Sequence, residues 1–226
     1  MPLYVAVFDA NGVLLNTKRM NERFQKGIEA LFKSEKILIK MAALSKEWRS
    51  IAADMDFSNG SLQSAREELF QRMDIPMRLL AKYSEIDRDS LAYCDPSEPG
   101  LKENIQKIKR LGLYVVVLSD TVHSKSEMEL MLSAAGLRGL FDAIIVPTDT
   151  GYTKPSREAY MAALEPFKAD PESSIFVGHA AEEIRGAKLA GMLTFAYGKK
   201  VREADYNVKD FKELFETLRT MKKQGR

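Results

Sequence analysis

The chain has 226 residues, of which 45% are hydrophobic and 29% charged, and its formal net charge is +2. These values are typical of one compact domain, with or without a smaller insertion, and they give no indication of a nucleic-acid or membrane partner. No apolar run approaches the roughly 20 residues that a membrane-spanning helix needs. Cys94 is the single cysteine, which excludes an internal disulfide. Because the first residues are typical of a strand rather than a signal peptide, we expect a cytoplasmic protein.

Five short apolar segments follow one another along the chain and predict the strands of a sheet. The first covers residues 3–8, and its continuous apolar character is typical of a strand buried on both faces. The later ones are "LYVVVLSD" (113–120), "FDAIIVPTD" (141–149), "SSIFVGH" (173–179) and "LTFAYG" (193–198).

Helical segments alternate with the later strands. Residues 98–111, 124–135 and 181–190 each stop at a glycine, and residues 155–167 open with a proline, as helix ends and helix starts often do. Alternation at this spacing predicts right-handed strand–helix–strand units, and therefore an α/β protein with a parallel sheet covered on both faces.

Residues 16–92 interrupt this alternation. They contain four stretches with apolar residues at spacings of three and four, which predict amphipathic helices. An insertion directly after the first strand would lie over the carboxyl edge of the sheet. We therefore expect a core formed by residues 1–15 and 93–226 and a helical cap formed by residues 16–92.

Polar side chains gather where the predicted strands end. Asp9, Ser119, Asp120, Asp149 and His179 all lie at or just after a strand terminus. Ligands of parallel α/β sheets bind beyond the carboxyl ends of the strands. This edge of the sheet is therefore the predicted site.

Four segments carry a resemblance to a known family: "VFDANGVLLN", "VVVLSDT", "GYTKPSREAY" and "FVGHAAEEIRGAKLAGM". In this order and at these distances, the chain resembles the haloacid dehalogenase (HAD) superfamily of hydrolases over nearly its whole length. The resemblance implies a Rossmann-like parallel α/β core with an inserted α-helical cap.

The resemblance also implies roles for individual residues. Asp9 holds the place of the nucleophile, which forms a covalent aspartyl intermediate. Gly12 allows the loop after it to turn tightly, so that its amides can face an anion. Ser119 matches the hydroxyl that holds a substrate oxygen. Lys154 matches the lysine that screens the nucleophile from an anionic substrate.

Two positions depart from the family's phosphatase pattern. Asn11 stands where phosphatases carry a second aspartate, whose acid–base help is typically worth about 10² to 10⁴ in rate. His179 stands where an aspartate binds Mg²⁺, leaving Asp9, Asn11, Glu183 and His179 as a weak metal set. Mg²⁺ prefers hard oxygen ligands, so we expect magnesium binding to be weakened.

Three functions remain open. The leading one is hydrolysis of a small anionic or phosphorylated substrate through Asp9, with Mg²⁺-dependent phosphatase activity weakened or lost. The second is a metal-independent 2-haloacid dehalogenase, in which Arg49 would receive the halide. The third is an anion-binding protein without catalysis.

Two further residues carry expectations. Asp120 borders the predicted substrate site and is expected to cap the helix that follows it. Asp149 sits where relatives often carry a residue that orients the motif lysine, so a structural role beside Lys154 is expected.

Overall fold

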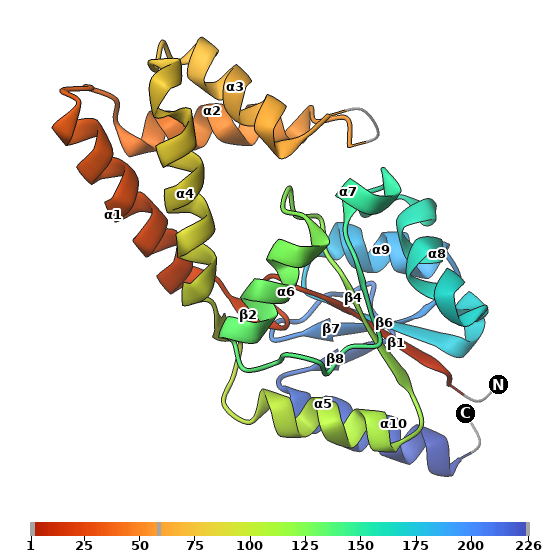
Figure 1. Ribbon diagram of the computed structural model, residues 1–226. Helices are drawn as coiled ribbons and strands as arrows, with labels where there is room; N and C mark the ends of the chain where they lie inside the picture. The colour runs from red at the N-terminus through yellow and green to blue at the C-terminus, as the bar shows by residue number, and fades with distance from the viewer. Residues whose placement is uncertain (1–2, 58–59, 225–226) are drawn as a thin grey trace.

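The computed structural model describes residues 3–57 and 60–224 and has a six-stranded parallel sheet at its centre (Figure 1). The strand order is β5-β4-β1-β6-β7-β8, and every neighbouring pair is parallel. The strands are β1 (Val5–Asp9), β4 (Tyr114–Leu118), β5 (Ala143–Ile145), β6 (Ser174–Gly178), β7 (Leu193–Tyr197) and β8 (Tyr206–Val208). The predicted α/β architecture is therefore confirmed.

Helices cover both faces of this sheet, which explains why β1 is apolar throughout. Ala6 and Phe8 point to a core shared with α5 (Leu101–Arg110), α6 (Lys125–Ala134) and α10 (Phe211–Lys223). Val5 and Val7 point to the opposite core, shared with α8 (Arg157–Leu164) and α9 (Ala181–Leu189). Successive side chains of a strand alternate between faces, so a strand with helices on both sides needs apolar residues at every position.

Several predicted boundaries are wrong; the helix expected over 98–111, for example, begins at Leu101. The strand expected over 141–149 ends at Ile145, because Pro147 opens the short helix α7 (Pro147–Thr150). Proline has a fixed φ that suits the first helical position and no N–H to continue a sheet ladder. The helix expected to open at Pro155 begins at Arg157 instead, because the Ser156 hydroxyl accepts a hydrogen bond from the amide of Ala159.

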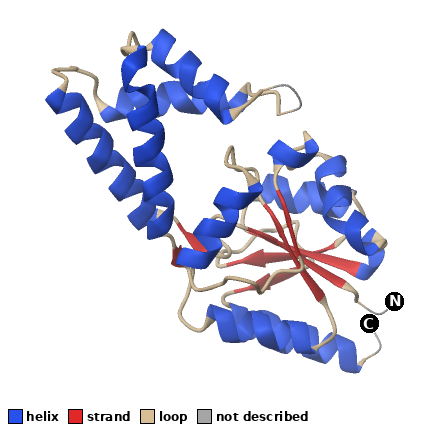
Figure 2. Cartoon of the chain, viewed as in Figure 1, coloured by secondary structure: helices blue, strands red, loops and turns tan. Residues whose placement is uncertain are grey.

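The residues between β1 and α5 form a group of helices beside the sheet, as Figure 2 shows. These are α1 (Lys18–Ser34), α2 (Met41–Ala53), α3 (Leu62–Arg72) and α4 (Leu80–Ser90), with short 3-10 turns at Met77–Leu79 and Leu91–Tyr93. They enclose a hydrophobic cluster of their own, which includes Phe32, Leu44, Phe70 and Tyr83. The antiparallel pair β2 (Leu15–Asn16) and β3 (Asp95–Pro96) joins them to the sheet. The division into a core and a cap domain stays a prediction.

A membrane crossing requires a long, continuously apolar helix. No helix in the described parts of the chain has that combination of length and apolar character.

Candidate active site

Asp9 is the last residue of β1 and lies at the carboxyl edge of the sheet. It pairs in register with Leu118, the last residue of β4, and only 4% of its surface is exposed. The chain then turns sharply at Gly12, whose φ of 81° is one that residues with a side chain rarely adopt. Asn11 is exposed on this turn and forms a bridge with Leu15. Asn11 therefore lies exposed two positions after Asp9, at the edge of the candidate site.

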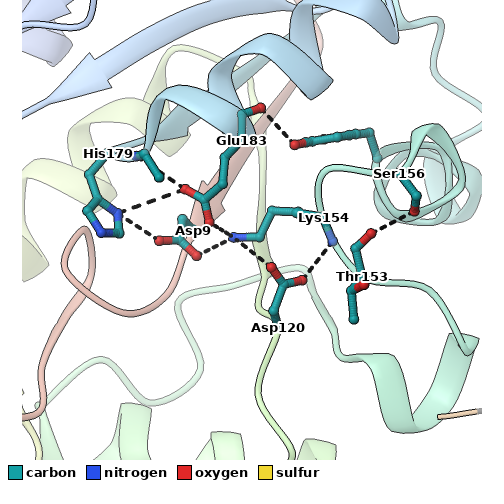
Figure 3. A network of polar contacts seen from close by, with 9 residues as sticks. Asp9, Asp120, Thr153, Lys154, Ser156, His179 and Glu183 are labelled. Carbon is teal, nitrogen blue, oxygen red and sulfur yellow. Dashed lines mark hydrogen bonds and ion pairs between the residues drawn. The ribbon is translucent and has the colours of Figure 1, made fainter. Parts of the chain in front are cut away.

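Lys154 is the centre of a buried polar network (Figure 3). Its ammonium donates to the Asp9 carboxylate and to Glu183 Oε1 at 2.8 Å, and Asp120 Oδ2 lies 3.9 Å away. Only 1% of the lysine side chain is exposed. Burial acts to lower the pKa of Lys154, but the surrounding carboxylates outweigh it and raise the pKa above its ordinary value. The lysine is therefore a fixed positive charge beside Asp9.

Asp120 has a different role from the one expected. The helix α6 begins at Lys125, and its N-cap is Ser124, which forms a reciprocal capping box with Glu127. Asp120 lies too far ahead of the first helical residue to cap the helix. Asp120 instead accepts a hydrogen bond from the amide of Lys154 at 2.9 Å. Burial, reinforced by Glu183 and Asp9, raises the pKa of Asp120 to about 6.

Asp149 was expected beside Lys154, but it is exposed on α7. Asp120, rather than Asp149, is the aspartate that contacts Lys154. The two segments that carry Asp120 and Lys154 lie 34 residues apart in sequence. No local pattern signals this contact, so sequence reasoning could not find it.

His179 lies against Asp9 from the side of the Gly12 turn. Its Nδ1 is 3.2 Å from Asp9 Oδ2 and 3.9 Å from Glu183 Oε2. A methyl group added at Gly12 would come within 3.2 Å of His179 Nε2, so the imidazole ring fills the space above the turn. Its contact with the Asp9 carboxylate raises the pKa of His179 above its ordinary value. Both oxygens of Asp9 therefore face a nitrogen, one from Lys154 and one from His179.

The position of α9 determines where Glu183, on the helix, and His179, just before it, lie relative to Asp9. Tyr160 donates a hydrogen bond from its hydroxyl to the backbone carbonyl of Glu183 at 2.7 Å, and it is fully buried. Gly186 brings α9 so close to the loop before α8 that an added Cβ would lie 2.6 Å from the carbonyl oxygen of Pro155. Tyr160 thus contributes by holding an element in place rather than by lining the site.

Ser119 follows Leu118 directly, at the same edge of the sheet as Asp9, and only 1% of it is exposed. Its amide donates to the carbonyl of Ile145 at 3.1 Å. Arg49 lies elsewhere: it is exposed on α2 and borders a cavity enclosed mainly by the inserted helices. The structure therefore brings Asp9, Lys154, His179 and Glu183 into one network and sets Arg49 apart from it.

Three of these side chains could hold a cation. Ligand atoms of Asp9, His179 and Glu183 all lie within 4.8 Å of one another. Transition metals accept an imidazole beside carboxylates, whereas Mg²⁺ prefers oxygen ligands in an octahedral arrangement. Asn11, the fourth residue of the expected metal set, lies exposed on the turn after Asp9.

Comparison with known proteins identifies relatives by sequence. A model of the haloacid dehalogenase-like hydrolases matches residues 5–191. The pyrophosphatase PpaX of Halalkalibacterium halodurans is 26% identical over 136 residues, which cover 60% of this chain and 61% of that protein. PpaX of Bacillus cereus strain G9842 is 28% identical over 118 residues, covering 52% and 54%. The match thus spans little more than half the length of these relatives.

Solved structures resemble the fold over nearly its full length. The 2-haloacid dehalogenase of Pseudomonas syringae superposes with a TM-score of 0.78 at 16% identity, covering 97% of this chain and 99% of that one. A HAD phosphatase of Thermococcus onnurineus superposes with a TM-score of 0.72 at 20% identity, covering 96% and 98%. At these identities the likeness establishes the fold alone.

Proposed function

The chain belongs to the haloacid dehalogenase-like hydrolases, and we propose that it hydrolyses small anionic substrates through Asp9 by a route that does not need Mg²⁺. One observation carries this proposal. The two oxygens of the Asp9 carboxylate face Lys154 and His179, so that nitrogen groups occupy the surroundings in which a magnesium-dependent enzyme needs oxygen ligands.

The proposed reaction has two steps. An oxygen of Asp9 attacks the electrophilic centre of the substrate, and the leaving group departs with the bonding electrons to leave an aspartyl ester. Water then attacks this ester and restores the Asp9 carboxylate. Lys154 stabilises the charge on the attacking carboxylate and on the anionic substrate. The Asp9 carboxylate raises the pKa of His179 in the free protein, and ester formation removes that charge, so that the neutral imidazole can accept the proton of the attacking water.

The residues around Asp9 do not fit Mg²⁺ as they stand. Glu183 and Asp9 already accept from the Lys154 ammonium, and the remaining member of the cluster is an imidazole. The Lys154 ammonium contacts Asp9 Oδ1 and Glu183 Oε1, so these groups would offer a dication Asp9 Oδ2, Glu183 Oε2 and the imidazole of His179. Such a mixed set suits Mg²⁺ poorly.

Asn11 narrows the choice of leaving group. An amide cannot donate a proton to the leaving atom as a carboxylic acid can. Substrates whose leaving group is stable without a proton, such as halides, fit this site better than ordinary alkyl phosphates. The dehalogenase reaction is therefore one form of the proposed activity.

Phosphate hydrolysis is the second candidate function. The matched PpaX proteins are named pyrophosphatases, and the cluster of Asp9, His179 and Glu183 offers a mixed nitrogen and oxygen set that suits a transition metal. In this alternative, turnover would depend on such a metal.

A substrate panel separates these functions. Halide and phosphate release are measured with short 2-haloacids, an aryl phosphate and pyrophosphate, in chelator, in Mg²⁺ and in Mn²⁺ or Zn²⁺. We expect release that persists in chelator and disappears in Asp9→Asn, while the control Asp149→Asn, altered at an exposed position, retains it. Release that requires an added metal would contradict the proposal and favour the second candidate. A panel without turnover, together with phosphate binding by calorimetry, would favour an anion-binding protein.

A further inference from the structure

Three carboxylates surround one ammonium at the candidate site (Figure 3). Asp9 and Glu183 each accept a hydrogen bond from the Lys154 ammonium, and Asp120 Oδ2 lies 3.9 Å from it. His179 contacts the other oxygen of Asp9. Like charges this close make it costly to ionise all three carboxyl groups, so a proton is held most easily by the one with the weakest positive contact. By these distances, that carboxyl group is Asp120.

Asp120 lies at the same edge of the sheet as the nucleophile. Asp9 pairs in register with Leu118 at the ends of β1 and β4, and Asp120 follows two residues later. The Asp120 side chain is 33% exposed, whereas that of Asp9 is 6% exposed. The amide of Lys154 donates to Asp120 Oδ1 at 2.9 Å, which fixes the carboxyl group beside the lysine. Asp120 is therefore held close to the reacting groups and remains accessible to a bound substrate.

The surroundings of Asp120 favour its neutral form. Burial raises the pKa of Asp120 to about 6, Glu183 and Asp9 add to this rise, and Lys154 opposes it. These charged groups come from α9, β1 and the loop before α8. A general acid is most effective when its pKa lies near the working pH. Below about pH 6, Asp120 therefore holds the kind of proton that the amide of Asn11 cannot supply.

We propose that Asp120 is the general acid of this site and donates its proton to the leaving oxygen of the substrate. As Asp9 attacks the electrophilic centre, the bond from that centre to the leaving oxygen breaks. The electron pair of this bond takes the proton of Asp120, and an alcohol or a phenol departs. The Asp120 carboxylate then regains a proton from solvent. This inference rests on the function proposed above and adds a substrate class to it, namely anionic esters whose leaving group needs a proton.

The test compares the natural protein with Asp120→Asn on two esters of similar size. Asparagine keeps an oxygen that can accept from the Lys154 amide, but it has no proton to transfer to a leaving group. Phenoxide is a strong base that leaves much faster when it is protonated, whereas 4-nitrophenoxide leaves readily without a proton. Initial rates with phenyl phosphate and 4-nitrophenyl phosphate give kcat/KM of both proteins from about pH 5 to about pH 8.

We expect Asp120→Asn to lower kcat/KM for phenyl phosphate by about 10²- to 10⁴-fold at about pH 5, and for 4-nitrophenyl phosphate by less than about tenfold. The ratio of natural to variant kcat/KM is followed with pH, because the titration of the substrate itself then cancels. For phenyl phosphate this ratio should fall as the pH rises through about 6, where Asp120 loses its proton. The control Asp149→Asn, at an exposed position of α7, should give ratios near one for both esters.

A second measurement needs no variant. In the natural protein, the turnover of phenyl phosphate relative to 4-nitrophenyl phosphate should fall over the same pH range, because only the first ester depends on the acid. A relative turnover that stays constant would contradict the inference. Circular dichroism establishes that Asp120→Asn is folded.

The outcomes separate this inference from the proposed function. A loss in Asp120→Asn that is equal for both esters and constant with pH would show that Asp120 only positions Lys154. Halide release from 2-haloacids without hydrolysis of either ester would show that no proton donor operates at the site. Either result would overturn the inference and leave the proposed function in place. If neither haloacids nor esters are hydrolysed, the proposed function fails and the inference fails with it.

Discussion

Asp120 shows how the environment of a single residue sets its charge. Its folded pKa of about 6 lies above the ordinary value of 3.8, mainly because of burial. The folded state therefore binds this proton more tightly than the unfolded state does. It follows that the contribution of Asp120 to the free energy of unfolding falls as the pH rises from about 4 to about 6.

The variant Asp120→Asn removes this titration and keeps an oxygen that can accept from the Lys154 amide. We expect the free energy of unfolding of the variant, minus that of the natural protein, to increase between pH 4 and 6 and to stay constant above pH 7. Urea denaturation across this range measures the difference. A difference for Asp120→Asn that does not change with pH would contradict the raised pKa of Asp120.

Asn11 and His179 are the two residues at which we expect this chain to depart from the phosphatase pattern. Asn11→Asp supplies a general acid, and His179→Asp supplies an oxygen ligand for Mg²⁺. Both changes act on one transition state, so we expect little gain from either alone and a larger than multiplicative gain from the pair. The measurement is hydrolysis of an aryl phosphate with and without Mg²⁺.

The activity of the double variant should require Mg²⁺ and should disappear when Asp9→Asn is added. Strong magnesium-dependent turnover by the unmodified protein would contradict this account, because Asn11 and His179 would then be no obstacle. A folded double variant that remains inactive would indicate that access of the substrate to the site, rather than these two residues, prevents phosphate hydrolysis.

Among the elements, α9 is the one whose position the candidate site depends on. Glu183 on this helix and His179 just before it reach Asp9 in an arrangement in which Gly186 allows close contact with the loop at Pro155. Alanine in a helix is ordinarily about 1 kcal/mol better than glycine. At Gly186 an added Cβ would meet backbone and Tyr160 at less than 3 Å.

We therefore expect Gly186→Ala to lower the free energy of unfolding by about 1–3 kcal/mol and to reduce turnover, since α9 must move away from α8. Urea denaturation and the assay of the proposed activity measure the two effects. Leu189→Ala serves as the control on the same helix, because Leu189 is 86% exposed and its loss should change stability by about 0.5 kcal/mol or less. A Gly186→Ala variant that is more stable than the natural protein would contradict this expectation, because the loop at Pro155 would then move aside at little cost in free energy.

At the scale of the whole molecule, the inserted helices and the sheet have separate hydrophobic clusters. The β2–β3 pair that joins them has only two residues in each strand. Units with separate cores can open at different free energies. We expect the amides of α1–α4 to exchange with solvent by an opening of lower free energy than those of β1, β4 and β6.

Hydrogen exchange followed by mass spectrometry measures this difference. Helix α10, which packs on the sheet, is the internal control for protection in the core. Equal protection throughout the chain would indicate one cooperative unit.

The sequence by itself determined five of the six sheet strands near their true positions, missing the three-residue β8, and it determined the place of Asp9, Ser119 and His179 at strand ends. These features are local: a buried parallel strand must be apolar along its length, and glycines mark the chain reversals after several helices. The same local reasoning misplaced the start of α8, because the capping bond of Ser156 competes with the proline signal beside it.

Only the tertiary structure decided which side chains meet. The contact of Lys154 with Asp9 joins residues 145 positions apart, and that of Asp120 with Lys154 joins residues 34 apart. A cavity among the inserted helices likewise combines residues of four helices, α1 to α4, with a loop of the core. Such contacts depend on how elements pack rather than on the preferences of any short segment, and one sequence carries no signal of them. The sequence therefore predicts which residues lie at the carboxyl edge of the sheet. It does not predict which of these side chains contact one another.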